Sequence, residues 1–207
     1  MKTMNTCSIP HVPDATYKRF LRFPPARPLE GAMAEAADWA QDWYGQHGRP
    51  WIVHTPVKIE VEEPQQLRVN GLPMGGSRVA RLFHQATGGE LILACAGIEA
   101  EEEAQRLWDA GEPDSYYFLE AYAAAVVESL LLRRRRELNE QEADTSWTAH
   151  ACPGHGNWSI LDNLKLIKIA RQALELPAEV DVLESGMLRP KKSLLGLMGC
   201  IKEEIRE

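Results

Sequence analysis

Helical spacing of apolar residues recurs along the chain. In residues 29–46, Met33, Ala36 and Ala40 recur every three to four positions and fall on one side of a helix, with Gly48 as an end signal. The same spacing, with Ser77 as a candidate N-cap of the first segment, predicts four more helices, in residues 75–86, 99–111, 114–141 and 158–174.

Strand spacing separates these helices. In residues 51–63, Val57, Ile59 and Val61 alternate with charged residues, which predicts one strand with a wet face. Residues 90–98 form a nearly continuous apolar run that is typical of a buried strand. Other predicted features are a tight turn at Asn70-Gly71, a strand in residues 146–152 that leads into a loop, and two short strands in residues 179–201 separated by residues 189–192.

The order of these elements indicates the fold class. Helices and strands are mixed without a regular βαβ alternation, so we predict an α+β fold with a twisted, mainly antiparallel sheet and flanking helices. No internal repeat or domain boundary is visible. We expect a loose N-terminal leader in residues 1–17, which contain Pro10 and Pro13, and a single domain in residues 18–207.

Composition narrows the functional classes. Of 207 residues, 44% are hydrophobic and 26% charged, as in ordinary globular proteins, and the net charge of −7 gives no basic field that would collect nucleic acid. The first residues lack the apolar core of a signal peptide, and the longest apolar run is too short to cross a membrane. The four cysteines show no CxxC spacing, so we expect reduced thiols and a cytoplasmic location. Because the chain has neither a basic field nor a membrane-spanning run, we expect no nucleic-acid or membrane partner.

The stretch His-Ala-Cys-Pro-Gly-His-Gly, residues 150–156, holds the densest candidate chemistry. His150, Cys152 and His155 are residue types that bind zinc, and Cys7 and His11 could complete a set of ligands. Their spacing matches no standard zinc pattern. The alternative is a chain turn made by the Pro-Gly pair, with histidines that happen to lie nearby.

Three other segments carry weaker candidates. The arginines at 133–136 point around the whole helix and are flanked by acids, which favours a solvated helix end over an anion site. Gly75 and Gly76 precede a helix and could hold a phosphate, but they lack the Walker and GxGxxG patterns. Residues 189–193 could grip an anion or keep a hairpin soluble. No nucleophile-elbow pattern surrounds a serine.

Three segments together resemble a known family. They are GSRVARLF with the later ELILACAGI, then HACPGHGNWSILDNLKLI, then LESGMLRPKKSLLGLMG. In order and spacing they resemble the activation (reactivation) domain of vitamin B12-dependent methionine synthase, in its stand-alone bacterial form. The second segment is similar to that family's Arg-x-x-Pro-Gly-Tyr loop and the helix after it. The resemblance covers most of the chain, from about Lys18 to Ile201.

This resemblance implies an accessory role beside a corrinoid. In that family the domain binds S-adenosylmethionine and docks over a cobalamin-bearing domain, where one electron and the methyl group restore methylcobalamin after accidental oxidation. The chain lacks the Asp-x-His-x-x-Gly signature of corrinoid carriers and any flavin or iron–sulfur motif. The cobalamin is therefore expected on a partner, either a corrinoid protein or methionine synthase itself, and the electron from an external donor.

The same resemblance assigns candidate ligand contacts, with departures from the family pattern. His150 stands at the position of the family's arginine, and His155 replaces the loop tyrosine. Histidine offers one donor where arginine offers a two-pronged clamp for a carboxylate. The S-adenosylmethionine-binding set implied is His150, Ala151, Pro153, Gly154, His155, Met198 and Gly199, with Lys191 and Lys192 as a hypothetical source of the missing positive charge.

These departures leave three functions open. The first is the accessory protein that positions S-adenosylmethionine for a corrinoid-dependent methyltransferase. The second is a non-catalytic cap or chaperone of a corrinoid protein that no longer binds the methyl donor, which the two histidine substitutions favour. The third is a small metal-binding protein that uses His150, Cys152 and His155.

Overall fold

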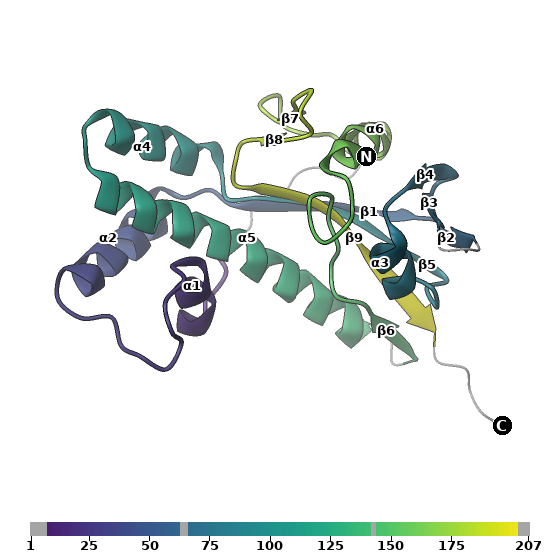
Figure 1. The fold of residues 1–207 in the computed structure, drawn as a ribbon, viewed down its shortest axis with the longest axis horizontal. Helices are drawn as coiled ribbons and strands as arrows, with labels where there is room; N and C mark the ends of the chain where they lie inside the picture. The colour runs from purple at the N-terminus through teal and green to yellow at the C-terminus, as the bar shows by residue number, and fades with distance from the viewer. Residues whose placement is uncertain (1–7, 63–65, 142–143, 203–207) are drawn as a thin grey trace.

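A four-stranded antiparallel sheet forms the centre of the computed structural model (Figure 1), which describes residues 8–62, 66–141 and 144–202. Its strand order is β1-β5-β9-β6, with bounds Trp51–Val57, Gly88–Cys95, Ser193–Lys202 and Thr145–Trp147. All three pairings are antiparallel. The α+β class and the antiparallel sheet predicted from the sequence are therefore confirmed.

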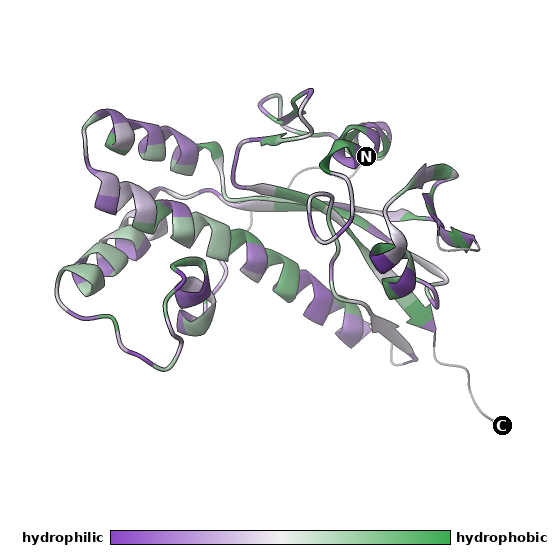
Figure 2. Cartoon of the chain, in the orientation of Figure 1, coloured by the Kyte–Doolittle hydropathy of each residue, from purple (hydrophilic) through white to green (hydrophobic). Residues whose placement is uncertain are grey.

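The two central strands, β5 and β9, are apolar on both faces. On β5, Leu91 and Leu93 point into one hydrophobic cluster, whereas Ile92 and Ala94 belong to the other. Side chains along a strand alternate between the faces of the sheet, so the uninterrupted apolar run of β5 places a core on each side. Figure 2 shows β5 and β9 as largely hydrophobic, while the outer turns of the helices carry the hydrophilic residues.

Helices cover one face of the sheet. The long helix α5, Pro113–Gln141, runs across it (Figure 1), and α1 (Asp14–Phe20), α2 (Ala32–His47) and α4 (Ile98–Asp109) pack against α5. The apolar middle of α5 is rich in alanine, and Ala123 and Ala125 are fully buried. Small side chains allow the neighbouring elements to approach closely. No helix in the described residues is long and apolar enough to span a membrane.

The other face carries smaller elements. A three-stranded sheet consists of β2 (Ile59–Glu62), β3 (Gln66–Val69) and β4 (Leu72–Met74), and it packs beside α3 (Ser77–Leu82). The predicted tight turn at Asn70-Gly71 joins β3 to β4, with φ of +48° and +80°. A short 3-10 helix, η1 (Ile160–Asp162), precedes α6 (Asn163–Ala173), which adds apolar residues to this core.

Two strand predictions were wrong in extent. The run 51–63 is not one strand: its alternation continues, but Lys58 divides β1 in the large sheet from β2 in the small one. At the C-terminal end the second strand is not short, because β9 has ten residues and lies between β5 and β6. Before it, β7 (Asp181–Val182) and β8 (Leu188–Arg189) form only a two-residue pairing.

The expected leader is partly ordered into the fold. Residues 1–7, which include Cys7, lie outside the described part. Helix α1 begins at Asp14, and the ring of Tyr17 is 2% exposed, with its hydroxyl donating to the carbonyl of Phe118 at 3.0 Å. Residues 14–17 are thus helical and Tyr17 belongs to the domain core, while the boundary placed at residue 17 otherwise stays a prediction.

Candidate ligand-binding site

A β-bulge positions the start of the loop at residues 150–156. The amide of Thr148 donates to the carbonyl of Gly199, and the amide of Gly199 donates to Oγ1 of Thr148, both at 2.9 Å. Further along, Ala151 pairs with Leu197. Two residues, Ala149 and His150, therefore face one residue of β9 between these pairs. Such a bulge bends the strand and shifts the alternation of its side chains by one residue. The predicted strand over 146–152 is accordingly confined to β6, with a single bridge at Ala151 beyond the bulge.

Glycines form the turn that follows. Gly154 and Gly156 have φ of +91° and +62°, values that favour glycine because a Cβ is strained there. The amide of Gly154 donates to the carbonyl of Trp158 at 2.9 Å, and the amide of His155 donates to the carbonyl of Cys152 at 3.2 Å. The loop is thus closed on itself by its own backbone.

Asp162 fastens this loop to the neighbouring elements. Its Oδ2 accepts from the indole N–H of Trp158 and from the amide of Gly75, both at 2.8 Å, and its Oδ1 lies 2.7 Å from Nζ of Lys165. A 7% exposed carboxylate is stable only with such partners. Asn157 adds a second link by donating from Nδ2 to Oγ of Ser77 at 3.1 Å. Both links hold the loop beside α3.

Two sequence predictions are corrected by these links. The Gly75-Gly76 pair does not present a free phosphate cradle, because the Gly75 amide already donates to Asp162. Ser77 is the first residue of α3 rather than its N-cap. The N-cap is Gly76, which makes no side-chain cap, and the Ser77 hydroxyl accepts from Asn157 instead.

Cys152 and His155 form a contact inside the loop. Sγ of Cys152 lies 3.0 Å from Nδ1 of His155. Burial, reinforced by the charge of Glu128, raises the pKa of Cys152 to about 12. The thiol is therefore protonated at neutral pH. A thiol in this state is a poor nucleophile, because the thiolate is the reactive form.

His150 faces helix α5. Its Nε2 lies 3.7 Å from Oε2 of Glu128, and both side chains are mostly buried. Burial lowers the pKa of His150 below its ordinary value, even though Glu128 opposes the shift, and the charges of His155, Arg135 and Arg19 lower it further. His150 is thus neutral at pH 7 and cannot replace the charge of an arginine.

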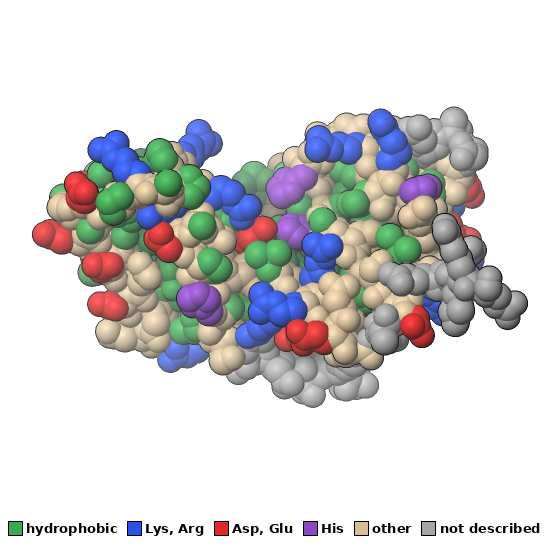
Figure 3. Space-filling model, turned by 90° about the horizontal axis from the view of Figure 1, so that it is seen from below, with side chains coloured by type: hydrophobic (Ala, Val, Ile, Leu, Met, Phe, Trp, Pro, Cys, Tyr) green, Lys and Arg blue, Asp and Glu red, His purple; other side chains and the backbone are tan. Residues whose placement is uncertain are grey.

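Two cavities flank the loop and share Cys152 and His155. The larger encloses about 520 Å³ between the loop and α3. The smaller, about 220 Å³, lies between the loop and the start of β9. Seen from below, histidine side chains lie beside the hollow between the two ends of the molecule (Figure 3). The larger cavity is lined by Arg78, Val79, Arg81, Leu82, His150, Ala151, Cys152, His155 and Gly156.

The predicted site residues divide between these places. His150 and Ala151 line the larger cavity, Pro153 and Lys191 line the smaller one, and His155 lines both. Gly154 lies in the turn between them, with Ile160 about 3.7 Å from the position of a Cβ. The structure thus brings the loop residues of the predicted set together.

Three predicted residues lie away from both cavities. Met198 is fully buried in the core on the side of α5. Gly199 packs under Phe83, whose ring would lie 2.7 Å from a Cβ there. Lys192 forms an ion pair with Glu120 of α5 at 2.9 Å, so its charge is already compensated. The hypothesis that Lys192 supplies the missing positive charge to the loop is therefore not supported.

His150, Cys152 and His155 do not form a metal-binding site. In residues 8–62, 66–141 and 144–202, no group of three or more His, Cys, Asp or Glu side chains could hold a metal ion. His150 points toward Glu128, while the side chains of Cys152 and His155 form a hydrogen bond with each other. Cys7, named as a further ligand, lies outside the described residues.

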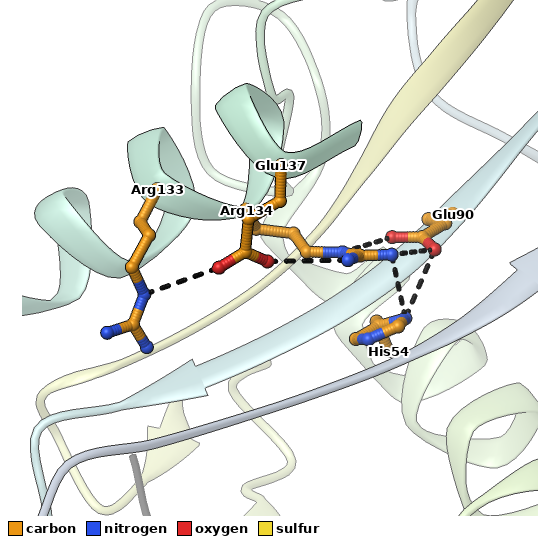
Figure 4. Close-up of polar contacts among 5 residues, drawn as sticks. All are labelled: His54, Glu90, Arg133, Arg134 and Glu137. Carbon is orange, nitrogen blue, oxygen red and sulfur yellow. Dashed lines mark hydrogen bonds and ion pairs between the residues drawn. The ribbon is translucent and has the colours of Figure 1, made fainter. Parts of the chain in front are cut away.

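The arginine run is not a solvated helix end, because Arg134 is buried between α5 and the sheet (Figure 4). Its Nε and Nη2 donate to the two carboxylate oxygens of Glu90 at 3.0 and 2.6 Å, and Nδ1 of His54 lies 3.1 Å from the same carboxylate. Arg135 donates from Nε to the carbonyl of Trp147 at 2.9 Å. These arginines join α5 to β1, β5 and β6.

Arg78 and Arg81 were not among the predicted site residues, yet they are the only permanently charged side chains in the lining of the larger cavity. Both belong to a helix that the sequence predicted. Residues three apart on a helix lie on one face, so this spacing could have placed the two guanidinium groups together. It could not have shown that this face turns toward the loop seventy residues later.

Comparison with known proteins bears on the fold. No protein-family model matches the sequence, and no curated protein matches it. Among solved structures, the crystal structure of the MetH reactivation domain bound to AdoHcy matches with a TM-score of 0.58. The fold resembles that of the MetH reactivation domain. This confirms the resemblance predicted from the loop and its flanking segments.

The match to the MetH reactivation domain is partial and low in sequence identity. The match covers 84% of this chain at 9% sequence identity, so it concerns the fold and not individual side chains. The matched region spans 66% of the MetH reactivation domain chain. The ligand named for that structure, AdoHcy, belongs to the MetH domain.

Proposed function

We propose that this protein is a stand-alone, activation-domain-like accessory protein for a corrinoid-dependent methyltransferase, and that it binds S-adenosylmethionine between α3 and the loop at 150–156. The observation that carries the proposal is the cavity of about 520 Å³ at this loop, in a fold that resembles an AdoHcy-bound reactivation domain. The bound ligand supplies the methyl group, while cobalamin and the electron come from partner proteins.

The residues present fit an S-adenosylmethionine-type ligand in size and chemistry. The cavity lies within the usual range for ligand sites, roughly 300–1,000 Å³. Val79 and Leu82 offer apolar surface, and Arg78 and Arg81 offer donors for a carboxylate. The chain's role in this proposal is positioning: a loop fastened by Asp162 and Asn157 holds the ligand in one orientation and shields it from water.

Calorimetric titration of the purified protein with S-adenosylmethionine and with AdoHcy tests the ligand part of this proposal. Saturable one-to-one binding of either compound is expected. The matched control is Ile160→Ala, which changes the lining of the smaller cavity only. Unchanged binding by this variant assigns the ligand to the larger cavity, whereas absence of any binding by the wild type contradicts the proposal.

A second function, a cap of a corrinoid protein without S-adenosylmethionine binding, is favoured by a specific observation. His150, at the position of the family's arginine, is neutral because burial lowers its pKa. Size-exclusion chromatography with a cobalamin-loaded fragment of methionine synthase distinguishes the two. The cap function predicts a complex with no effect of S-adenosylmethionine, whereas the first proposal predicts that the ligand changes the apparent affinity of the complex.

A further inference from the structure

The lining of the larger cavity carries positive charge, although the protein as a whole is acidic. The whole chain carries a net charge of −7, yet the lining of this cavity contains two arginines, two histidines and no acidic residue. The positive charge is that of the two guanidinium groups, and a cleft focuses the field of charges of one sign. The cavity therefore favours a ligand group with negative charge.

The side chains of Arg78 and Arg81 are exposed, and neither has an acidic partner among the described residues. Arg81 donates only to the carbonyl of Ser77 in its own helix, at 3.4 Å. Arg68, Arg106 and Arg171, by contrast, are each paired with a carboxylate at 3.0 Å or less. The guanidinium groups of Arg78 and Arg81 are thus available for an anion.

The loop is shaped to receive Arg78. A Cβ at Gly156 would lie 3.3 Å from Cδ of Arg78 and 3.9 Å from its Nη1. The glycine, which has φ of +62°, leaves room for the arginine side chain to lie along the loop backbone. This packing directs the guanidinium group along the edge of the cavity, beside the loop that carries His150 and His155.

We infer that Arg78 and Arg81 bind the carboxylate of the ligand's amino-acid portion, in place of a loop arginine. The inference rests on the proposed function. A planar guanidinium group matches a carboxylate with two parallel hydrogen bonds, which neither neutral histidine nor lysine can do. Lys191 lines the other cavity, and Lys192 is paired with Glu120, so neither competes for this role.

Two ligands that differ only in the carboxylate test this inference. Calorimetric titration compares S-adenosylmethionine with decarboxylated S-adenosylmethionine, for the wild type, Arg78→Ala, Arg81→Ala and the double variant. Each single substitution is expected to weaken S-adenosylmethionine binding by about tenfold or more, as for other charge-assisted hydrogen bonds. Binding of the decarboxylated compound is expected to stay within about twofold of the wild type.

Matched variants separate this role from general charge effects. Lys191→Ala removes the same charge beside the neighbouring cavity and is expected to leave both affinities unchanged. Arg78→Lys retains the charge but loses the fork, and an affinity between those of wild type and Arg78→Ala is expected. Both arginines are exposed, so thermal unfolding of the variants is expected to match the wild type.

The outcomes distinguish failure of the proposed function from failure of the inference about Arg78 and Arg81. If the wild type binds neither compound, the proposed function fails and the inference fails with it. If the wild type binds S-adenosylmethionine but the arginine variants bind it equally well, or lose both compounds equally, the inference alone is overturned. Selective loss of the carboxylate-bearing compound supports both.

Discussion

Arg134 and Glu90 form a buried ion pair that joins α5 to the central sheet. Burial alone would raise the pKa of Glu90, but hydrogen bonds from His54 and Arg134 outweigh it and hold the pKa below its ordinary value. Both oxygens of the carboxylate are occupied, and the guanidinium group also reaches Glu137 at 3.4 Å. Removal of one partner would leave a charge in a site that is at least nine-tenths buried.

Glu90→Gln is therefore expected to lower the free energy of unfolding by about 3 kcal/mol at pH 7, the usual cost of breaking a buried pair. Urea denaturation measures the change. The matched control is Glu137→Gln, which removes the exposed partner of the same arginine and is expected to cost less than about 1 kcal/mol. Equal effects of the two substitutions would contradict a buried, fully engaged pair.

The pH dependence follows from the direction of the Glu90 shift. A carboxylate whose pKa is lower in the folded state stabilises the protein above the unfolded-state pKa, about 4.3, and loses this contribution as the pH falls through the folded-state pKa. The difference in stability between wild type and Glu90→Gln is expected to shrink below about pH 4.

The burial of Arg134 and its pairing with Glu90 could not be predicted from the sequence. Four consecutive arginines point around the helix, so a helix packed on a sheet must direct at least one of them inward. The flanking acids suggested solvent, but the partner of the inward arginine, Glu90, lies 44 residues earlier. In the sequence Glu90 only marked the polar start of an apolar run, and the pairing depends on how α5 crosses β5.

At the scale of elements, the close approach of β9 to the bulged strand shapes the loop at residues 150–156. Gly196 lies opposite this strand, and a Cβ there would meet the carbonyl oxygen of Ala151 at 2.6 Å and Cβ of Cys152 at 3.2 Å. Because Ala151 and Leu197 are joined by two hydrogen bonds of 2.8 and 2.9 Å, the strand cannot move away without breaking this bridge.

Gly196→Ala is expected to destabilise the protein by about 1–3 kcal/mol, as overpacking usually does, and to weaken S-adenosylmethionine binding because the loop is displaced. Thermal unfolding and calorimetric titration measure the two effects. Gly88→Ala on β5 is the matched control, since its Cβ would meet nothing closer than 3.9 Å. Wild-type stability in Gly196→Ala would show that the two strands are not held as closely as described.

Which elements were predictable depended on whether their pattern was local. The helices α2, α4 and α5 and the strand β5 show their own periodicity and were predicted nearly to their ends. The division at Lys58 and the length of β9 were not, because in both cases the apolar pattern fits either arrangement and the pairing partner decides. The bulge at residues 149–150 likewise exists only relative to β9.

At the scale of the whole molecule, the two hydrophobic clusters on the faces of the sheet support different parts of the protein. The cluster on the side of α5 holds α1, α2 and α4, whereas the other holds the three-stranded sheet, α3 and α6. In Figure 1, α2 and α4 lie at the opposite end of the molecule from α3. A ligand between α3 and the loop therefore contacts one end only.

Hydrogen–deuterium exchange is accordingly expected to change unevenly when S-adenosylmethionine binds. Saturation at about 100 times the dissociation constant stabilises the bound state by about 2.7 kcal/mol, which slows exchange through local opening by up to about 100-fold. This slowing is expected in residues 77–83 and 148–158, which contain the lining of the larger cavity, and not in α2 or α4. Arg78→Ala and Arg81→Ala together are expected to abolish it at the same ligand concentration. Uniform slowing across both clusters would instead mean that the ligand couples to global unfolding, and slowing confined to residues 187–195 would move the ligand to the smaller cavity beside Lys191.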